Sequence, residues 1–280
     1  GKWVFGNANN TPRVARIDLK TFRTAEIIEL PNSGGNHSSP FITENTEYVV
    51  AGTRFSIPPD DKNGDVPNNT YKENFKGTIS FISVQKDNGA MEIAFQLQCP
   101  GVNFDLSRAG KGVSNGWFFF STYNTEQANT LLEVNASQKD KDFIMAVNWK
   151  KAEEYIKAGK GRKQAVKYAH NVYSDETHSA TSTIKTQVTV LDVKDFPDVA
   201  YFFPCPKSPH GCDVSPTGEY IVGSGKLAAL IPVFSFDKMI KAIAAKDFIG
   251  EFDGLPILKY ESVLHGEVKK PGLGPLHTEF

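Results

Sequence analysis

The sequence predicts an all-β protein built as a β-propeller, with short helical insertions. One strand–turn–strand pattern recurs along the chain, and several copies are followed by a third apolar strand that ends near a proline. Where it is undisturbed, the pattern repeats about every 45 residues, which is a usual size for a propeller blade. Strands joined by hairpins and followed by an exit to the next unit are typical of a blade. A two-sheet sandwich is the alternative, but sandwiches seldom repeat a whole strand–turn–strand unit.

The two leading strands of each unit have distinct compositions. The first carries an aromatic residue near its start, and the second is hydrophobic and ends near a polar residue. The pairs are predicted at residues 2–6 and 13–18, 47–51 and 78–83, 116–120 and 142–147, and 219–223 and 231–236. Residues 187–192 are interpreted as another copy of the second strand. The third strands are predicted at residues 25–31, 91–100 and 199–204.

Three insertions interrupt the repeat, at residues 54–76, 121–141 and 150–185. Two further stretches, residues 152–158 and 237–245, have the apolar spacing of short amphipathic helices. We expect these helices to cover edge strands of the blades.

Composition excludes several classes of function. The chain has 280 residues, 40% hydrophobic and 22% charged, which is ordinary for a globular protein with a substantial core. Thirty-one basic and thirty-two acidic residues nearly cancel, and no basic stripe interleaves with aromatics, so no nucleic-acid partner is expected. The longest apolar runs, such as residues 227–234, are far shorter than the roughly 20 residues of a membrane span.

The cysteines and the chain ends carry less information. Cys99, Cys205 and Cys212 form neither a CxxC pair nor an even disulfide framework, so they do not fix the redox compartment. The chain opens without Met and stops at Phe280 with no closing element, so we expect an internal fragment.

Three histidines occupy informative positions in the repeat. His37 and His210 each follow the outermost strand of one unit and precede the innermost strand of the next. In a propeller this crossing enters the strand that lines the channel, so such residues converge on the axis. His277 precedes what would be another inner strand, whereas the unit at residues 91–100 has Asn103 and Asp105 in the corresponding segment.

Histidines without thiolate or carboxylate partners suit copper, zinc, iron or nickel. A single histidine is more often a satisfied core or turn residue than a ligand. The equivalent positions in the repeat favour a shared metal site for His37, His210 and His277. We expect His170, His178 and His265, which lie in polar inserts or loops, to be solvated.

Several segments resemble the nitrous-oxide reductases. Residues 208–216, followed by residues 222–226, resemble the histidine–glycine segment of that family, and residues 272–278 resemble its second such segment. Residues 9–18, with residues 27–31, resemble the segment that precedes another cluster ligand, here His37. The resemblance runs almost from end to end of the chain.

This resemblance implies a seven-bladed propeller followed by a cupredoxin domain. Residues 1–280 would then be part of the N-terminal propeller, and the cupredoxin domain, with its dinuclear copper centre, would be absent from this chain. The propeller axis of the family holds a sulfide-bridged tetranuclear copper cluster ligated by seven histidines. His37, His210 and His277 would be three of these ligands, and Ser208, Asn36 and Asp213 are candidates to orient their rings.

The implied reaction is the two-electron, two-proton reduction of nitrous oxide to dinitrogen and water, a step of denitrification. The resemblance also implies a periplasmic location, a homodimer in the full-length protein, and a cytochrome or cupredoxin as electron donor.

A calcium site is a further expectation. Tyr123, Glu126 and Asp140 provide the oxygen donors that calcium prefers, although their spacing matches no EF-hand loop and by itself favours a solvated acidic loop. The family resemblance implies a structural calcium site at these residues, with the carbonyl of Val134 as a further ligand. Many members have Asn where this chain has Ser208, so the chain departs from the pattern at that calcium ligand.

Two other functions are compatible with a propeller. A non-catalytic interaction or ligand-binding module, a common use of the fold, would leave the three histidines without metal and without mutual contact. A mononuclear metal hydrolase would need carboxylates and a general base beside the histidines.

Overall fold

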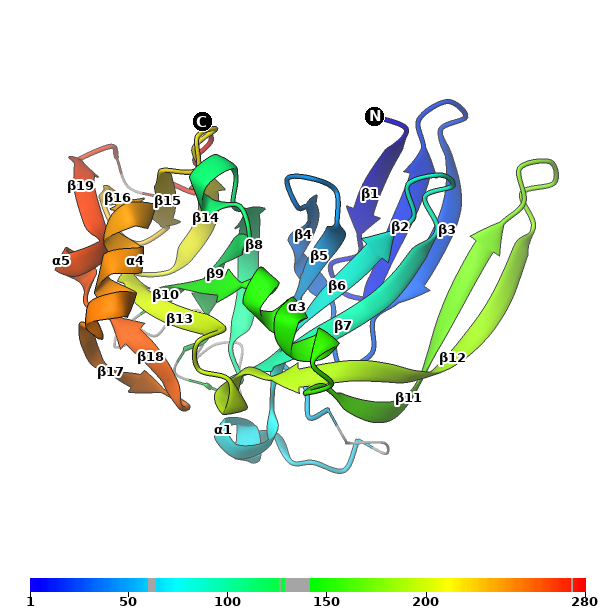
Figure 1. Cartoon of the computed structure of the whole chain (residues 1–280), viewed down its shortest axis with the longest axis horizontal. Coiled ribbons are helices and arrows are strands. Elements are labelled where there is room, and N and C mark those ends of the chain that lie inside the picture. Colours follow the sequence, from blue (N-terminus) through cyan, green and yellow to red (C-terminus); the bar gives the residue numbers. More distant parts are fainter. Residues whose placement is uncertain (60–63, 126, 129–141, 273) are drawn as a thin grey trace.

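The computed structural model describes residues 1–59, 64–125, 127–128, 142–272 and 274–280 (Figure 1). Its strands form three complete four-stranded antiparallel blades and a three-stranded unit at the N-terminus. The three-stranded unit consists of β1 (Trp3–Asn7), β2 (Arg13–Asp18) and β3 (Arg23–Glu29). The expected all-β fold, a partial propeller, is confirmed.

The three complete blades follow one another along the chain. The first consists of β4 (Asn36–Ile42), β5 (Tyr48–Thr53), β6 (Gly77–Val84) and β7 (Met91–Cys99). The second consists of β8 (Asn103–Ala109), β9 (Trp117–Tyr123), β10 (Asp142–Asn148) and β13 (Ala200–Cys205). The third consists of β14 (Pro209–Val214), β15 (Tyr220–Gly225), β16 (Leu230–Ser235) and β19 (Leu264–Lys269).

The first strands of the blades lie next to one another. β8 contacts β4 on one side and β14 on the other, and β1 contacts β4. Figure 1 shows β4 and β8 near the middle of the molecule, with the later strands of their blades fanning outward. The first strand of each complete blade is therefore its inner strand, as in a propeller.

A long hairpin joins two of the units. Its strands are β11 (Arg162–Tyr173) and β12 (Ala180–Asp192), and it is inserted between β10 and β13. β11 pairs antiparallel with β3 and β12 pairs parallel with β7, so the N-terminal unit, the hairpin and the first blade form one nine-stranded sheet. The interpretation of residues 187–192 as a blade's second strand was therefore wrong. Val188, Val190 and Leu191 are buried at this junction and so carry the apolar pattern of a blade strand.

The helices are short and cap the blades. They are α1 (Tyr71–Asn74), α3 (Trp149–Lys157), α4 (Phe236–Ala245) and α5 (Tyr260–Val263), with 3₁₀ turns at Asn68–Thr70, Gly112–Ser114 and Val193–Asp195. The two predicted amphipathic helices correspond to α3 and α4. Asn148 and Ser235 cap their N-termini by accepting hydrogen bonds from the backbone N–H groups of Lys151 and Lys238. A second hairpin, β17 (Phe248–Phe252) and β18 (Leu255–Leu258), extends the second blade beyond β13.

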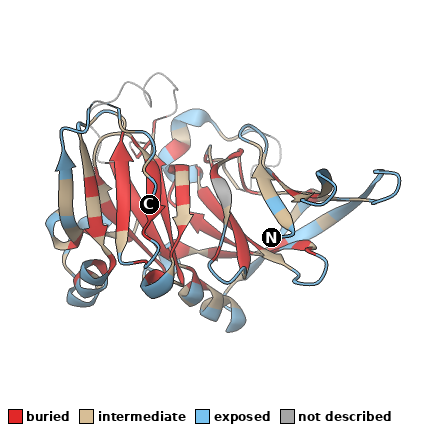
Figure 2. Ribbon diagram, turned by 90° about the horizontal axis from the view of Figure 1, so that it is seen from above, coloured by how far each residue is buried: buried red, intermediate tan, exposed pale blue. Residues whose placement is uncertain are grey.

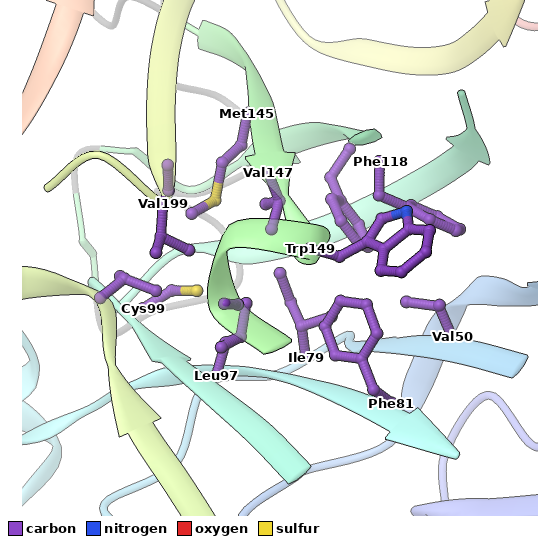
Figure 3. Close-up of a cluster of buried hydrophobic side chains, with 14 of the residues drawn as sticks. Val50, Ile79, Phe81, Leu97, Cys99, Phe118, Met145, Val147, Trp149 and Val199 are labelled. Atoms are coloured by element: carbon purple, nitrogen blue, oxygen red, sulfur yellow. The ribbon is translucent and has the colours of Figure 1, made fainter. Parts of the chain in front are cut away.

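The core lies between the blades, where Figure 2 shows the buried residues concentrated. Successive side chains of a strand point to opposite faces, so a strand buried on both faces is apolar throughout. Phe118 and Phe120 of β9 join a cluster with Phe81 of the first blade, close to Trp149 (Figure 3). Phe119, between them, packs with Phe203 and the third blade. The continuous aromatic run of β9 thus serves two blade interfaces at once.

Within the part of the chain that the structure describes, no helix is long and apolar enough to span a membrane. In the same residues, Cys99, Cys205 and Cys212 are buried free thiols. Burial raises the pKa of the Cys99 and Cys212 thiols, so both are held in the neutral form.

Candidate metal centre

The inner strands bring two of the predicted histidines together. His37 is the second residue of β4 and His210 is the second residue of β14, so both stand at the start of an inner strand. Their ring centroids lie 5.5 Å apart. Asp105, the third residue of β8, occupies the corresponding end of the strand between them. Three equivalent strand ends therefore meet at one point.

Asp105 contacts both rings with its carboxylate. One oxygen contacts Nδ1 of His37, and the other lies 2.6 Å from Nδ1 of His210. Nζ of Lys226 lies 3.6 Å from the latter oxygen. Asp105 is only 3% exposed, and burial by itself raises its pKa, but the hydrogen bonds from His210 and His37 outweigh this effect and lower the pKa to about 2.

The carboxylate also selects the nitrogen that each ring offers. An oxygen that accepts a hydrogen bond at Nδ1 requires a proton there, so the lone pair of a neutral imidazole is left on Nε2. A carboxylate or carbonyl on the second nitrogen is the usual partner of a metal-binding histidine, because it fixes both the ring orientation and the tautomer. The hydrogen bond to Asp105 therefore leaves Nε2 as the free nitrogen of His210, and the contact of Asp105 with Nδ1 of His37 favours the same tautomer there.

His277 reaches the same place from the C-terminal segment. Its ring lies 4.9 Å from the ring of His210, at nearly a right angle. The hydroxyl of Ser224 accepts a hydrogen bond from the backbone N–H of Gly211 and donates one to the carbonyl of Leu276. A Cβ on Gly211 would lie 2.5 Å from that carbonyl oxygen. The absence of a side chain at residue 211 therefore lets this segment lie against β14.

The residues proposed from sequence to orient the rings are engaged elsewhere. The Asp213 carboxylate pairs with Nε of Arg108 at 2.7 Å and accepts a hydrogen bond from the backbone of Phe280. Ser208 donates its backbone N–H to Asp142, and Asn36 lies beside Ser33. Asp105 contacts two of the rings instead, and its place in the repeat, equivalent to those of His37 and His210, is the signal that could have identified it.

The three histidines outside the candidate site differ in how far they are exposed. His170 contradicts the expectation of a solvated residue, because its Nε2 lies 2.5 Å from the carboxylate of Glu26 and its side chain is 12% exposed. The carboxylate belongs to β3, and no pattern in the sequence predicted that β3 lies beside β11. His178 and His265 are exposed, as expected, and lie against Tyr173 and Tyr220.

The predicted calcium ligands are only partly within the described residues. Glu126, Val134 and Asp140 lie outside them. The hydroxyl of Tyr123 donates a hydrogen bond to the carbonyl of Arg54 at 3.2 Å, and burial raises the Tyr123 pKa. Ser208 has a left-handed backbone with φ of 59°.

Among the described residues, no group of three or more His, Cys, Asp or Glu side chains forms a ready-made site for a metal ion. His37, His210 and His277 are therefore neighbours by their ring contacts, but their side chains do not form a complete coordination site by themselves.

Comparison with known proteins gives one consistent relationship. No family model matches the chain. It is similar to the nitrous-oxide reductases of Pseudomonas fluorescens (29% identity over 289 residues), Stutzerimonas stutzeri (28% over 285) and Ralstonia nicotianae (27% over 292). Each alignment covers 100% of this chain, which spans only 38–39% of the relatives' length. The resemblance inferred from sequence is therefore confirmed along the whole chain.

Solved structures show a weaker likeness. They include a hypothetical selenium-binding protein from Sulfolobus tokodaii (TM-score 0.39, 11% identity, 92% of this chain and 44% of that one). The β-propeller domain of Swd1 from Myceliophteria thermophila matches with a TM-score of 0.35 and 8% identity, over 84% of this chain and 62% of that one. Scores this low carry no functional conclusion.

Proposed function

We propose that this chain is part of the catalytic propeller of a nitrous-oxide reductase, and that His37, His210 and His277 are copper ligands. One observation carries the proposal. The ends of three inner strands bring His37, Asp105 and His210 together beside His277, in a chain that resembles nitrous-oxide reductases throughout. The whole protein would reduce nitrous oxide to dinitrogen and water.

The donor set fits copper. Imidazole nitrogens suit copper among the first-row metals. The contacts of Asp105 are at Nδ1 of His37 and His210, which would leave Nε2 of each ring to bind the metal. A tetranuclear copper–sulfide cluster, when bound, supplies the electron storage for the two-electron reduction.

In this proposal the histidine side chains bind the metal and the side chain of Asp105 orients two of their rings. With its pKa lowered to about 2, Asp105 stays ionised at neutral pH and keeps the Nδ1 protons of both rings in place. The ammonium group of Lys226 lies on the same carboxylate and offsets its charge. In this proposal the histidines act as ligands and not as acids or bases.

The proposal extends to the rest of a protein of the relatives' length. Its further elements are the remaining cluster ligands, a cupredoxin domain with a dinuclear copper centre, a homodimer, a periplasmic location and a cytochrome or cupredoxin donor. The resemblance supports these elements.

We also propose a structural calcium ion held by Tyr123, Glu126, Asp140 and the carbonyl of Val134, with Ser208 as the position that departs from the family. The hydroxyl of Tyr123 and the carbonyl of Arg54 are 3.2 Å apart. Calcium content before and after chelation tests the assignment. An unchanged unfolding temperature and no bound calcium would contradict it.

The experiment that tests the function compares two proteins. We expect the 280-residue chain to bind copper weakly, without sulfide, and not to reduce nitrous oxide, because it offers three of the implied seven histidines. A protein of the relatives' full length that contains this chain should hold the cluster and turn over nitrous oxide with a reduced dye. Copper and sulfide content are measured on both. Four coppers and turnover in the 280-residue chain would overturn the ligand assignment, and a metal-free, inactive longer protein would support the non-catalytic module instead.

A further inference from the structure

We infer that the inserted hairpin β11–β12 positions His37. The hairpin is inserted in the sequence of the second blade, whereas His37 lies on β4 of the first. The hairpin positions His37 through a buried cluster of three amide side chains, Asn32, Gln96 and Gln164. The inference rests on the proposed function only in treating the orientation of His37 as important. The contacts that carry it are independent of any metal.

The hairpin leaves the second blade after β10 and inserts between β3 and β7 (Figure 1). There β11 places Gln164 beneath the segment that crosses from β3 to β4. This segment, residues 30–35, leads directly into His37. The hairpin, which is inserted in the second blade, therefore contacts the segment that leads into the first blade.

The three amides satisfy one another. Nδ2 of Asn32 donates to Oε1 of Gln96 at 3.0 Å and to Oε1 of Gln164 at 2.9 Å. Nε2 of Gln164 donates back to Oδ1 of Asn32 at 3.2 Å and to the carbonyl of Pro59 at 3.3 Å. All three side chains are buried. A buried amide that loses its partner is left with an uncompensated polar group, so such a cluster strongly favours one arrangement.

The cluster holds the crossing segment in a conformation that few residues adopt. Asn32 has a φ of 62°, in the left-handed region that Asn tolerates better than most residues. Gln96 also donates to the carbonyl of Pro31 at 2.8 Å. Beyond this point the chain is held by the hydrogen bonds from Gly34 N–H to the Phe55 carbonyl and from Asn36 N–H to the Ala8 carbonyl. The crossing segment is thus fixed on successive sides by the hairpin, the first blade and the N-terminal unit.

The hairpin is itself anchored on the far side. His170 of β11 contacts the buried carboxylate of Glu26, which also accepts hydrogen bonds from Arg16 and the backbone of Met91. Polar contacts therefore hold β11 at two points, at His170 on the N-terminal unit and at Gln164 on the crossing segment.

The test uses variants in the metal-free chain. Gln164→Leu keeps approximate size and removes the amide, and Asn32→Gly keeps the left-handed backbone and removes the other amide. Gln187→Leu, at an exposed position of the same hairpin, is the matched control. The readouts are the imidazole ¹⁵N–¹H signals of His37 and the hydrogen exchange of the Gly34 and Asn36 amides.

We expect both cluster variants to shift or broaden the His37 signals while those of exposed His178 and His265 stay unchanged. The Gly34 and Asn36 amides should exchange about tenfold faster or more, since a net hydrogen bond corresponds to roughly one order of magnitude in a local opening equilibrium. The double variant should change the readouts by less than the sum of the two single variants, because both remove the contact between Asn32 and Gln164 and only Asn32→Gly also removes the hydrogen bond to Gln96.

A lower unfolding temperature with unchanged His37 signals and unchanged exchange would overturn the inference, because the amides would then be merely structural. If Gln164→Leu does not fold, the His37 signals and the amide exchange of Asn32→Gly test the inference by themselves. Copper content plays no part in these readouts, so failure of the proposed function and failure of this inference are separate results.

Discussion

At the scale of single residues, one carboxylate links histidines from two blades. Asp105 contacts Nδ1 of His37 and Nδ1 of His210, and it comes from the strand that lies between theirs. A carboxylate has two oxygens and so can accept from both rings at once. An amide of the same shape cannot, which gives a direct test.

We predict that Asp105→Asn changes the tautomer of one histidine. The NH₂ group of Asn would face one Nδ1, so that ring would move its proton to Nε2 and lose the nitrogen intended for metal. Copper affinity in a protein of full length should fall by about 10–100-fold. The imidazole ¹⁵N shifts report the tautomer and copper titration reports the affinity. Asp237→Asn, at an exposed position on α4, is the control, and equal behaviour of the two variants would contradict the role of Asp105.

A second residue-scale prediction concerns acid stability. Glu26 is 1% exposed, and burial by itself raises its pKa, but hydrogen bonds from His170, Met91 and Arg16, with the Arg16 charge, lower the pKa below its usual 4.5. A depressed pKa contributes stability above the unfolded value, and this contribution is lost as pH falls through the folded pKa. The free energy of unfolding should therefore decline below about pH 4.5.

Glu26→Gln should destabilise the chain by about 3 kcal/mol at pH 7, because it leaves the buried Arg16 charge unpaired. The difference from the wild type should shrink as the pH is lowered. Chemical denaturation at pH 7 and pH 3 measures it, with exposed Glu251→Gln as the control. A destabilisation by Glu26→Gln that is equal at both pH values would contradict the assigned ionisation.

At the scale of elements, the site depends on how closely strands and segments approach. β14 carries His210, and the segment that carries His277 packs against the same strand. Gly211 is the contact point, since a Cβ there would lie 2.5 Å from the Leu276 carbonyl and 2.6 Å from the Ser224 hydroxyl. The two atoms are hydrogen-bonded to each other, so an added Cβ would have to displace them and break that contact.

We predict that Gly211→Ala displaces residues 274–280 without unfolding the blades. Limited proteolysis should cut this segment faster, and the ring contact between His210 and His277 should disappear from nuclear Overhauser spectra. Gly266→Ala is the matched control, because a Cβ on Gly266 meets nothing within 4 Å. Unchanged proteolysis in Gly211→Ala would show that the segment is not held against β14.

At the scale of the whole molecule, the repeat pattern predicted the middle strands of the blades but not the inner strands β4, β8 and β14, which were not among the predicted strand ranges. The β2 and β10 strands begin at the predicted residues, because an alternating pattern in β2 and a continuous apolar run in β10 are both local signals of a strand. The hairpin β11–β12 was not predicted as such. Its pairing with β3 and β7 joins segments far apart in sequence, and no local pattern in one sequence contains that information.

The candidate site, like the fold, could be predicted only in part from the sequence. Equivalent positions in the repeat identified His37 and His210, since convergence at the axis follows from topology alone. Asp105 was not identified as the residue that contacts their rings, because hydrogen bonding depends on side-chain geometry. Its position was noted only as one where the repeat has no histidine. The pairing of His170 with Glu26 was missed for the same reason as the hairpin.

The central claim is that the three converging histidines bind the metal at which nitrous oxide is reduced. The most direct measurement is copper content and nitrous-oxide turnover in a protein of full length carrying His210→Ala, beside the exposed control His265→Ala. We predict that His210→Ala loses cluster copper and activity while His265→Ala keeps both. Full copper content and turnover in His210→Ala would contradict the claim.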